Sequence, residues 1–150
     1  AQLSAAVSEY LLTGTHSSLG EYLGILAQGY MAAGDHEQAL ITINNAFGAT
    51  PEELMHLPTL HRTHADILWK QPDPDLDVVE KTYRQSIEIS QQFGSLMEEL
   101  ISVTHLGRLL QSCGRSSEAL TLLKPLYAKF TESFDTVALR EAKELLDELS

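Results

Sequence analysis

The sequence predicts an all-α fold, an α-α superhelix of about three helix hairpins with a flanking N-terminal helix and a C-terminal capping helix. Two observations carry this prediction. Gly34, Gly94 and Gly114 each follow an apolar stretch with helical periodicity, where a left-handed residue can end a helix. A pattern of helix, glycine turn and second helix occurs around Gly34 and again around Gly114. Repetition at this scale is typical of stacked helical arrays, which usually bind rather than catalyse.

The first half of the chain should hold a leading helix, a regular hairpin and a longer, interrupted helical stretch. We expect these helices over residues 2–13, 18–33, 36–48 and about 50–70. Ser18 and Glu21 have the spacing of a capping box at the start of the hairpin. Thr50 and Pro51 place a cap and a first-turn proline at the start of the fourth of these helices. Pro58 should interrupt or restart that helix, because proline cannot donate the backbone hydrogen bond that a continuous helix needs.

The second half should hold four helices, the last of which closes the array. We expect these helices over residues 74–93, 95–113, 116–130 and 135–149. Asp73 is expected to cap the first of them and Pro74 to begin it. Ser95 and Glu98 repeat the capping-box spacing, and Pro125 should bend the helix that contains it. The last helix has one apolar stripe and one charged face, as expected of a terminal capping helix.

These elements are assigned to one domain over residues 1–150. Its repeat units are expected at about 18–50, 51–94 and 95–131, followed by the capping helix at 135–149. Because the chain begins at Ala1 inside an expected helix, we interpret it as a C-terminal fragment of a larger protein.

Composition and charge narrow the classes of partner. The formal net charge is −11, and the ten basic residues are scattered along the chain. Proteins that bind nucleic acid gather their basic residues into a patch or stripe, so neither nucleic acid nor an anionic membrane is an expected partner. No apolar run approaches the roughly 20 residues that cross a bilayer. The single cysteine, Cys113, cannot form an internal disulfide, which favours a reducing compartment, by default the cytoplasm.

The alternation of small and large residues around the glycine turns resembles the tetratricopeptide repeat (TPR). One unit carries the resemblance on Leu26, Ala27, Tyr30, Gly34, Asp35, Ala39, Ile43, Ala46 and Pro51, and another on Leu106, Gly107, Leu110, Gly114, Ala119 and Leu123. A weaker middle copy has Ala65, Leu68, Val79 and Tyr83. The resemblance implies stacked helix hairpins that bind proteins or peptides on a concave face.

A second resemblance extends from Thr13 to the end of the chain and is most specific near that end. It rests on Leu12 to Gly14, Tyr22 to Ala27, Leu60 to Arg62, Phe130 to Thr136 and Leu139 to Lys143. These segments are similar to the C-terminal repeat region of large bacterial signalling proteins. In that family a class III adenylate or guanylate cyclase domain, or a DNA-binding domain, precedes an ATPase module and the repeats. The resemblance implies a regulatory rather than a catalytic role for this chain, whose sequence contains no phosphate-binding loop.

Three side-chain patterns resemble metal-binding or catalytic sites, but each lacks a feature that such a site requires. Asp73, Asp75 and Asp77 alternate as in a calcium loop, but Val78 stands where the turn needs glycine. His61 and His64 could face one zinc ion, with Asp66 and His56 nearby, but two imidazoles do not complete a zinc site. Cys113 and His105 are eight residues apart on one expected helix and cannot touch. We therefore expect no catalytic residue, metal or cofactor.

The remaining candidate is the concave surface. In stacked hairpins the first helix of each unit lines that side, so residues that point away from the small-residue contacts are the best candidates. They are Gln28, Met31, Arg62, Asp66, Trp69, Thr104, Arg108 and Gln111. Trp69 is the strongest single choice, because tryptophan is enriched among residues that dominate binding.

Two functions remain open. The first is a non-catalytic interaction or regulatory module that binds a protein, a peptide or neighbouring domains and relays a signal to upstream cyclase and ATPase domains. The alternative is a sensor domain whose pocket binds a small effector. A partner groove should be open, whereas an effector site should be a closed apolar pocket with a few convergent polar groups. The sequence leaves the partner and the oligomeric state open.

Overall fold

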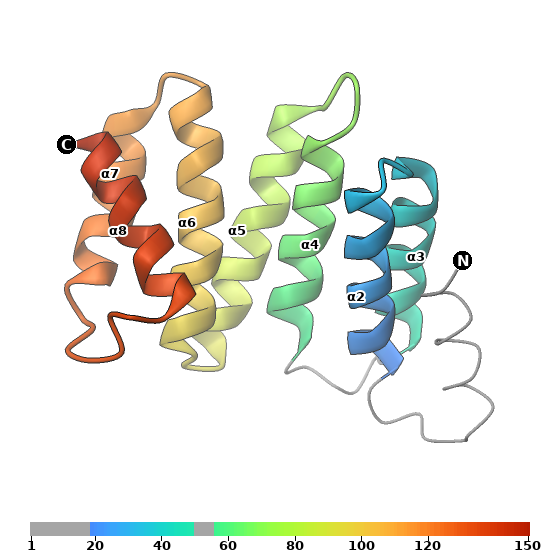
Figure 1. The fold of residues 1–150 in the computed structure, drawn as a ribbon, viewed down its shortest axis with the longest axis horizontal. Helices are drawn as coiled ribbons and strands as arrows, with labels where there is room; N and C mark the ends of the chain where they lie inside the picture. Colours follow the sequence, from blue (N-terminus) through green and yellow to red (C-terminus); the bar gives the residue numbers. More distant parts are fainter. Residues whose placement is uncertain (1–18, 50–55) are drawn as a thin grey trace. The chain divides into compact units, whose positions relative to one another are not determined.

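The computed structural model describes residues 19–49 and 56–150, which form seven α-helices and no strand (Figure 1). The helices are α2 (Leu19–Ala32), α3 (His36–Ala49), α4 (Leu57–Trp69), α5 (Leu76–Gln92), α6 (Leu96–Ser112), α7 (Ser116–Tyr127) and α8 (Val137–Leu149). The all-α prediction is confirmed. The helix expected over residues 2–13 and the caps expected at Ser18 and Thr50 lie outside the described residues.

The chain divides into two compact units, which are described separately. Unit 1 extends to Thr82, and unit 2 runs from Tyr83 to Ser150. The boundary falls within α5, so the first part of this helix belongs to unit 1 and the rest to unit 2.

Unit 1 is built on the hairpin of α2 and α3, against which α4 packs (Figure 1). Gly34 turns the hairpin with a φ of 82°, a left-handed conformation that glycine adopts without a steric penalty. The Asp35 carboxylate then accepts a 3.1 Å hydrogen bond from the backbone amide of Gln38 and caps α3. Fully buried alanines at positions 27, 39 and 46 let α2 and α3 approach closely, and Ile43, Leu60 and Ile67 complete the core.

Unit 2 contains the remainder of α5 and the helices α6, α7 and α8. Its core includes Leu100, Val103, Leu123, Leu126, Leu139, Ala142 and Leu145. A Cβ atom added to Gly107 on α6 would lie 2.8 Å from Cδ2 of Leu145 on α8, so the missing side chain lets these two helices meet. Gly94 and Gly114 have φ values of 66° and 74°, as their positions after the helices predict.

Of the caps predicted within the described residues, the one at Ser95 is confirmed and the one at Asp73 is not. The Ser95 hydroxyl accepts a 3.4 Å hydrogen bond from the Glu98 amide, and Thr136 caps α8 in the same way. The prediction that Asp73 caps α5 is wrong. Asp75 does so, because its carboxylate lies 3.2 Å and 3.3 Å from the amide nitrogens two and three residues later.

Prolines also set helix bounds. Pro58 stands in the first turn of α4, where its missing N–H would have had no partner within the helix. α4 begins at Leu57, in agreement with the break predicted at Pro58. α7 ends at Tyr127, three residues before the predicted end, with Pro125 in its last turn. In residues 19–49 and 56–150, no helix combines the length and the apolar character required for a membrane span.

Candidate binding faces

In unit 1, the predicted site residue on α2 that contacts α4 is Gln28. Its side-chain amide is exposed and donates a 3.1 Å hydrogen bond to the Thr63 hydroxyl on α4. Met31 is half-buried and packs against the apolar core of the unit. Gln28 therefore lies on the surface shared by α2 and α4, while Met31 mainly supports it.

The predicted residues on α4 are less accessible than expected. Arg62 is only 8% exposed, and its guanidinium Nη2 lies 3.4 Å from the Thr59 hydroxyl. Asp66 and Trp69 are half-buried. A buried guanidinium contributes to packing within the chain and is poorly placed to bind a partner. The candidate binding surface of unit 1 is therefore formed by more exposed neighbours of these residues.

A small hollow of about 150 Å³ lies between α2 and α4. Its lining residues are Glu21, Gly24, Ile25, Gln28, His56, Thr59 and Leu60. Gly24 forms part of its floor, because a Cβ atom there would lie 3.0 Å from Cδ2 of Leu60. Ile25 remains 52% exposed at its edge. The hollow, named here the α2–α4 hollow, thus presents an exposed apolar side chain beside a concave surface.

Polar groups stand beside this apolar contact. The Glu21 carboxylate lies 3.9 Å from Nε2 of His56, within ion-pair distance when the imidazole is protonated. The Gln28 amide and the Thr59 hydroxyl add neutral hydrogen-bonding groups. Of these residues the predicted concave face contained only Gln28. The sequence did contain one sign of this surface. Tyr22 and Ile25 are apolar and three residues apart on α2, and both side chains are exposed.

In unit 2, the predicted residues on α6 are already engaged by the chain itself. Thr104 is 4% exposed, and its hydroxyl donates to the Leu100 carbonyl. Arg108 forms a 2.6 Å ion pair with the Glu148 carboxylate of α8, and the Gln111 amide donates to the same oxygen at 3.1 Å. The hydrogen bond from Gln111, followed by the bond and charge of Arg108, lowers the pKa of Glu148. The α6 face is therefore occupied by α8.

The two histidines of α4 pack against an aromatic ring. The ring centroid of Phe47 lies 4.8 Å from that of His61 and 5.9 Å from that of His64. Burial lowers the pKa of both histidines, and the neighbouring His64 lowers that of His61 further. Within residues 19–49 and 56–150, no group of three or more His, Cys, Asp or Glu side chains is placed to hold a metal ion. The geometry favours a packing role for this pair.

Comparison with known proteins adds no assignment. Neither the models of known protein families nor the curated proteins contain a match to this chain. The resemblance to TPR domains and to the signalling proteins therefore stays a prediction.

Proposed function

We propose that the chain is a non-catalytic, TPR-type interaction module whose binding surface in unit 1 is the α2–α4 hollow with Ile25 at its edge. The observation that carries this proposal is the 52% exposure of Ile25 at the edge of a hollow floored by Gly24 and Leu60. Exposed apolar side chains beside a concavity gain free energy when a partner covers them. A protein segment with an apolar side chain would provide that cover.

The charge of the chain supports a partner with basic character. Glu21 lies at the hollow, and the whole chain has a net charge of −11. Such a field accelerates association with a positively charged surface and slows association with an acidic one. Under the predicted family resemblance, the partner is a neighbouring cyclase or ATPase domain of the same protein, to which the module relays a signal.

A matched pair of substitutions tests the α2–α4 hollow. Ile25→Asp places a charge at its edge, whereas Ile41→Asp makes the same change on α3, where the isoleucine is 46% exposed. With the upstream domains of the full reading frame as the partner, isothermal titration calorimetry should show at least about a tenfold loss of affinity for Ile25→Asp. The Ile41→Asp variant should bind as the unmodified chain does. Equal effects of the two changes would contradict the proposal.

The effector-sensor function is tested separately. Saturable thermal stabilisation by a metabolite would favour a sensor, because a ligand that binds only the native state raises its stability. The α2–α4 hollow has room for about 150 Å³, less than the roughly 300–1,000 Å³ of typical small-molecule pockets. This size favours contact with a side chain of a larger partner.

A further inference from the structure

The α2–α4 hollow is bounded at both ends by a contact between its two helices. At one end the Glu21 carboxylate lies 3.9 Å from Nε2 of His56, and at the other the Gln28 amide donates a 3.1 Å hydrogen bond to the Thr63 hydroxyl. Both helices advance by seven residues between these two contacts, so they run parallel here and the hollow is about 10 Å long. This length and the volume of about 150 Å³ suit one long side chain.

The lining of this hollow has an apolar part and a charged part. Gly24 and Leu60 form the floor, and the exposed Ile25 stands at the edge. Glu21 is the one described lining residue that carries a charge whenever the imidazole of His56 is neutral. A carboxylate beside an apolar surface favours a cation on an apolar stem and disfavours an anion.

No arginine or lysine of the described lining opposes this carboxylate. Arg62 belongs to α4, but it is 8% exposed, its Nη2 lies 3.4 Å from the Thr59 hydroxyl, and it does not line the hollow. Within residues 19–49 and 56–150, the approach of His56 is the one ion-pair or hydrogen-bond contact of the Glu21 side chain. That side chain is 52% exposed, so a partner can reach it.

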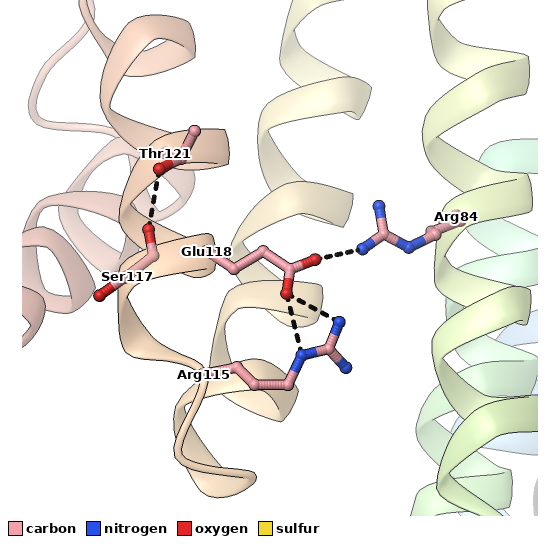
Figure 2. Close-up of polar contacts among 5 residues, drawn as sticks. All are labelled: Arg84, Arg115, Ser117, Glu118 and Thr121. Atoms are coloured by element: carbon pink, nitrogen blue, oxygen red, sulfur yellow. Dashed lines mark hydrogen bonds and ion pairs between the residues drawn. The ribbon is translucent and has the colours of Figure 1, made fainter.

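Another carboxylate of the chain shows what this position lacks. Glu118, in the first turn of α7, pairs with Arg84 of α5 at 2.9 Å and with Arg115 at 2.7 Å (Figure 2). Glu21 has the same first-turn position on α2, but in the part of the chain that the structure describes no arginine or lysine pairs with it. A guanidinium from a partner would give Glu21 the contact that Glu118 finds within the chain.

We propose that the partner's anchor in the α2–α4 hollow is an arginine side chain, an inference that rests on the function proposed above. Its methylene stem lies over Gly24 and Leu60, and its guanidinium pairs with the Glu21 carboxylate. The planar guanidinium can donate to both carboxylate oxygens at once, whereas the ammonium group of lysine acts as a point charge. Apolar neighbours of the arginine in the partner then cover Ile25.

An NMR titration of the isotope-labelled 150-residue chain tests this anchor, because it detects the weak binding of a single side chain. The probe is N-acetylarginine N-methylamide, and its control is the citrulline counterpart, which has the same shape without the charge. At about pH 7.5, where an ordinary histidine is neutral, the arginine probe should produce saturable shifts at the backbone amides of residues 21–28 and 56–63. The citrulline counterpart should bind at least about threefold more weakly, as expected for the loss of a half-exposed ion pair. The lysine counterpart should bind between the two.

Glu21→Gln removes the charge and keeps the shape of the side chain, so it should abolish the preference for arginine over citrulline. Glu37→Gln is the matched control, because Glu37 occupies the first turn of α3, is exposed and does not line the hollow. It should leave the affinity for the arginine probe within about twofold of the unmodified chain, because screened distant charges contribute little. Equal effects of the two variants would overturn the arginine anchor. The same conclusion would follow from an absence of saturable shifts in these two segments, or from equal binding of the citrulline or lysine counterpart.

Failure of this inference and failure of the proposed function give different results. Calorimetry with the upstream domains of the full reading frame compares the effects of Ile25→Asp and Glu21→Gln on the affinity for the whole partner. The expected result is a loss with both variants, at least about threefold for Glu21→Gln. A loss with Ile25→Asp alone would overturn the arginine anchor and leave the proposed surface standing. No loss with Ile25→Asp would contradict the proposed function, whatever the arginine probe does.

Discussion

Replacing Gly107 by alanine adds one methyl group at the closest approach of α6 and α8. The new Cβ atom would lie 2.8 Å from Cδ2 of Leu145, and ordinary van der Waals contact begins at 3.4 Å. Leu145 must therefore shift by about 0.6 Å, although its side chain is completely buried. Overpacking of this kind destabilises a protein by about 1–3 kcal/mol.

Helix propensity acts in the opposite direction. Alanine is favoured over glycine inside a helix by about 1 kcal/mol, so the expected net loss for Gly107→Ala is about 0–2 kcal/mol. Gly48→Ala on α3 is the matched control, because no atom lies within 4 Å of its added Cβ. Gly48→Ala should be neutral or stabilising by up to about 1 kcal/mol. Urea unfolding followed by far-UV circular dichroism measures both differences.

A double-mutant cycle isolates the clash. Leu145→Ala alone should destabilise the chain by about 2–5 kcal/mol, because it leaves a cavity in a buried cluster. In that background Gly107→Ala no longer meets Cδ2 and should become stabilising. The reasoning is refuted if Gly107→Ala stabilises the unmodified chain as much as Gly48→Ala does, or if its effect is the same in both backgrounds.

Three further predictions concern acid, the glycine turns and the surface ion pairs. Because burial lowers the folded-state pKa of His61 and His64, the unfolded chain binds more protons, so stability should fall as the pH drops below about 6.5. Urea unfolding at several pH values, followed by the fluorescence of the single tryptophan, Trp69, should show this fall in the free energy of unfolding. A His61→Gln, His64→Gln variant whose free energy falls equally with pH would contradict the reasoning. Gly114→Ala should lower the free energy of unfolding by about 1 kcal/mol, because the φ of this residue is 74°. An unchanged free energy in urea unfolding followed by circular dichroism would show that alanine is not strained there. Glu118→Gln should change that free energy by less than about 1 kcal/mol, because the ion pairs are about 40% exposed; a larger loss in urea would show that the bridge stabilises the fold.

Local chemistry made the helix order predictable. Glycine at a turn, serine or threonine before a helix, and alanine at a close approach each act through short-range sterics or hydrogen bonds. Gly34, Gly94 and Gly114 all have the expected positive φ. Where two neighbouring carboxylates competed for one cap, at Asp73 and Asp75, the sequence alone could not rank them, because the choice depends on the path of the connecting loop.

The candidate surfaces were less predictable, because they depend on contacts between distant segments. Helical periodicity assigned Arg108 and Gln111 to the predicted concave face, but it could not show that Glu148, 40 and 37 residues later, binds them both. It also placed Arg62 on a face without showing that its guanidinium is buried. The α2–α4 hollow escaped prediction because its two helices belong to different predicted repeat units.

The contacts of Glu148 have one more consequence. Arg108 and Gln111 hold a single carboxylate oxygen with a charged and a neutral donor, which is how a binding site would grip an acidic ligand. α8 thus serves as a built-in ligand of α6, tethered to its receptor by the chain. An external acidic ligand would have to displace Glu148 from Arg108 and Gln111. Because Glu148 belongs to the same chain, its effective concentration at this position is far higher than that of a free ligand in solution.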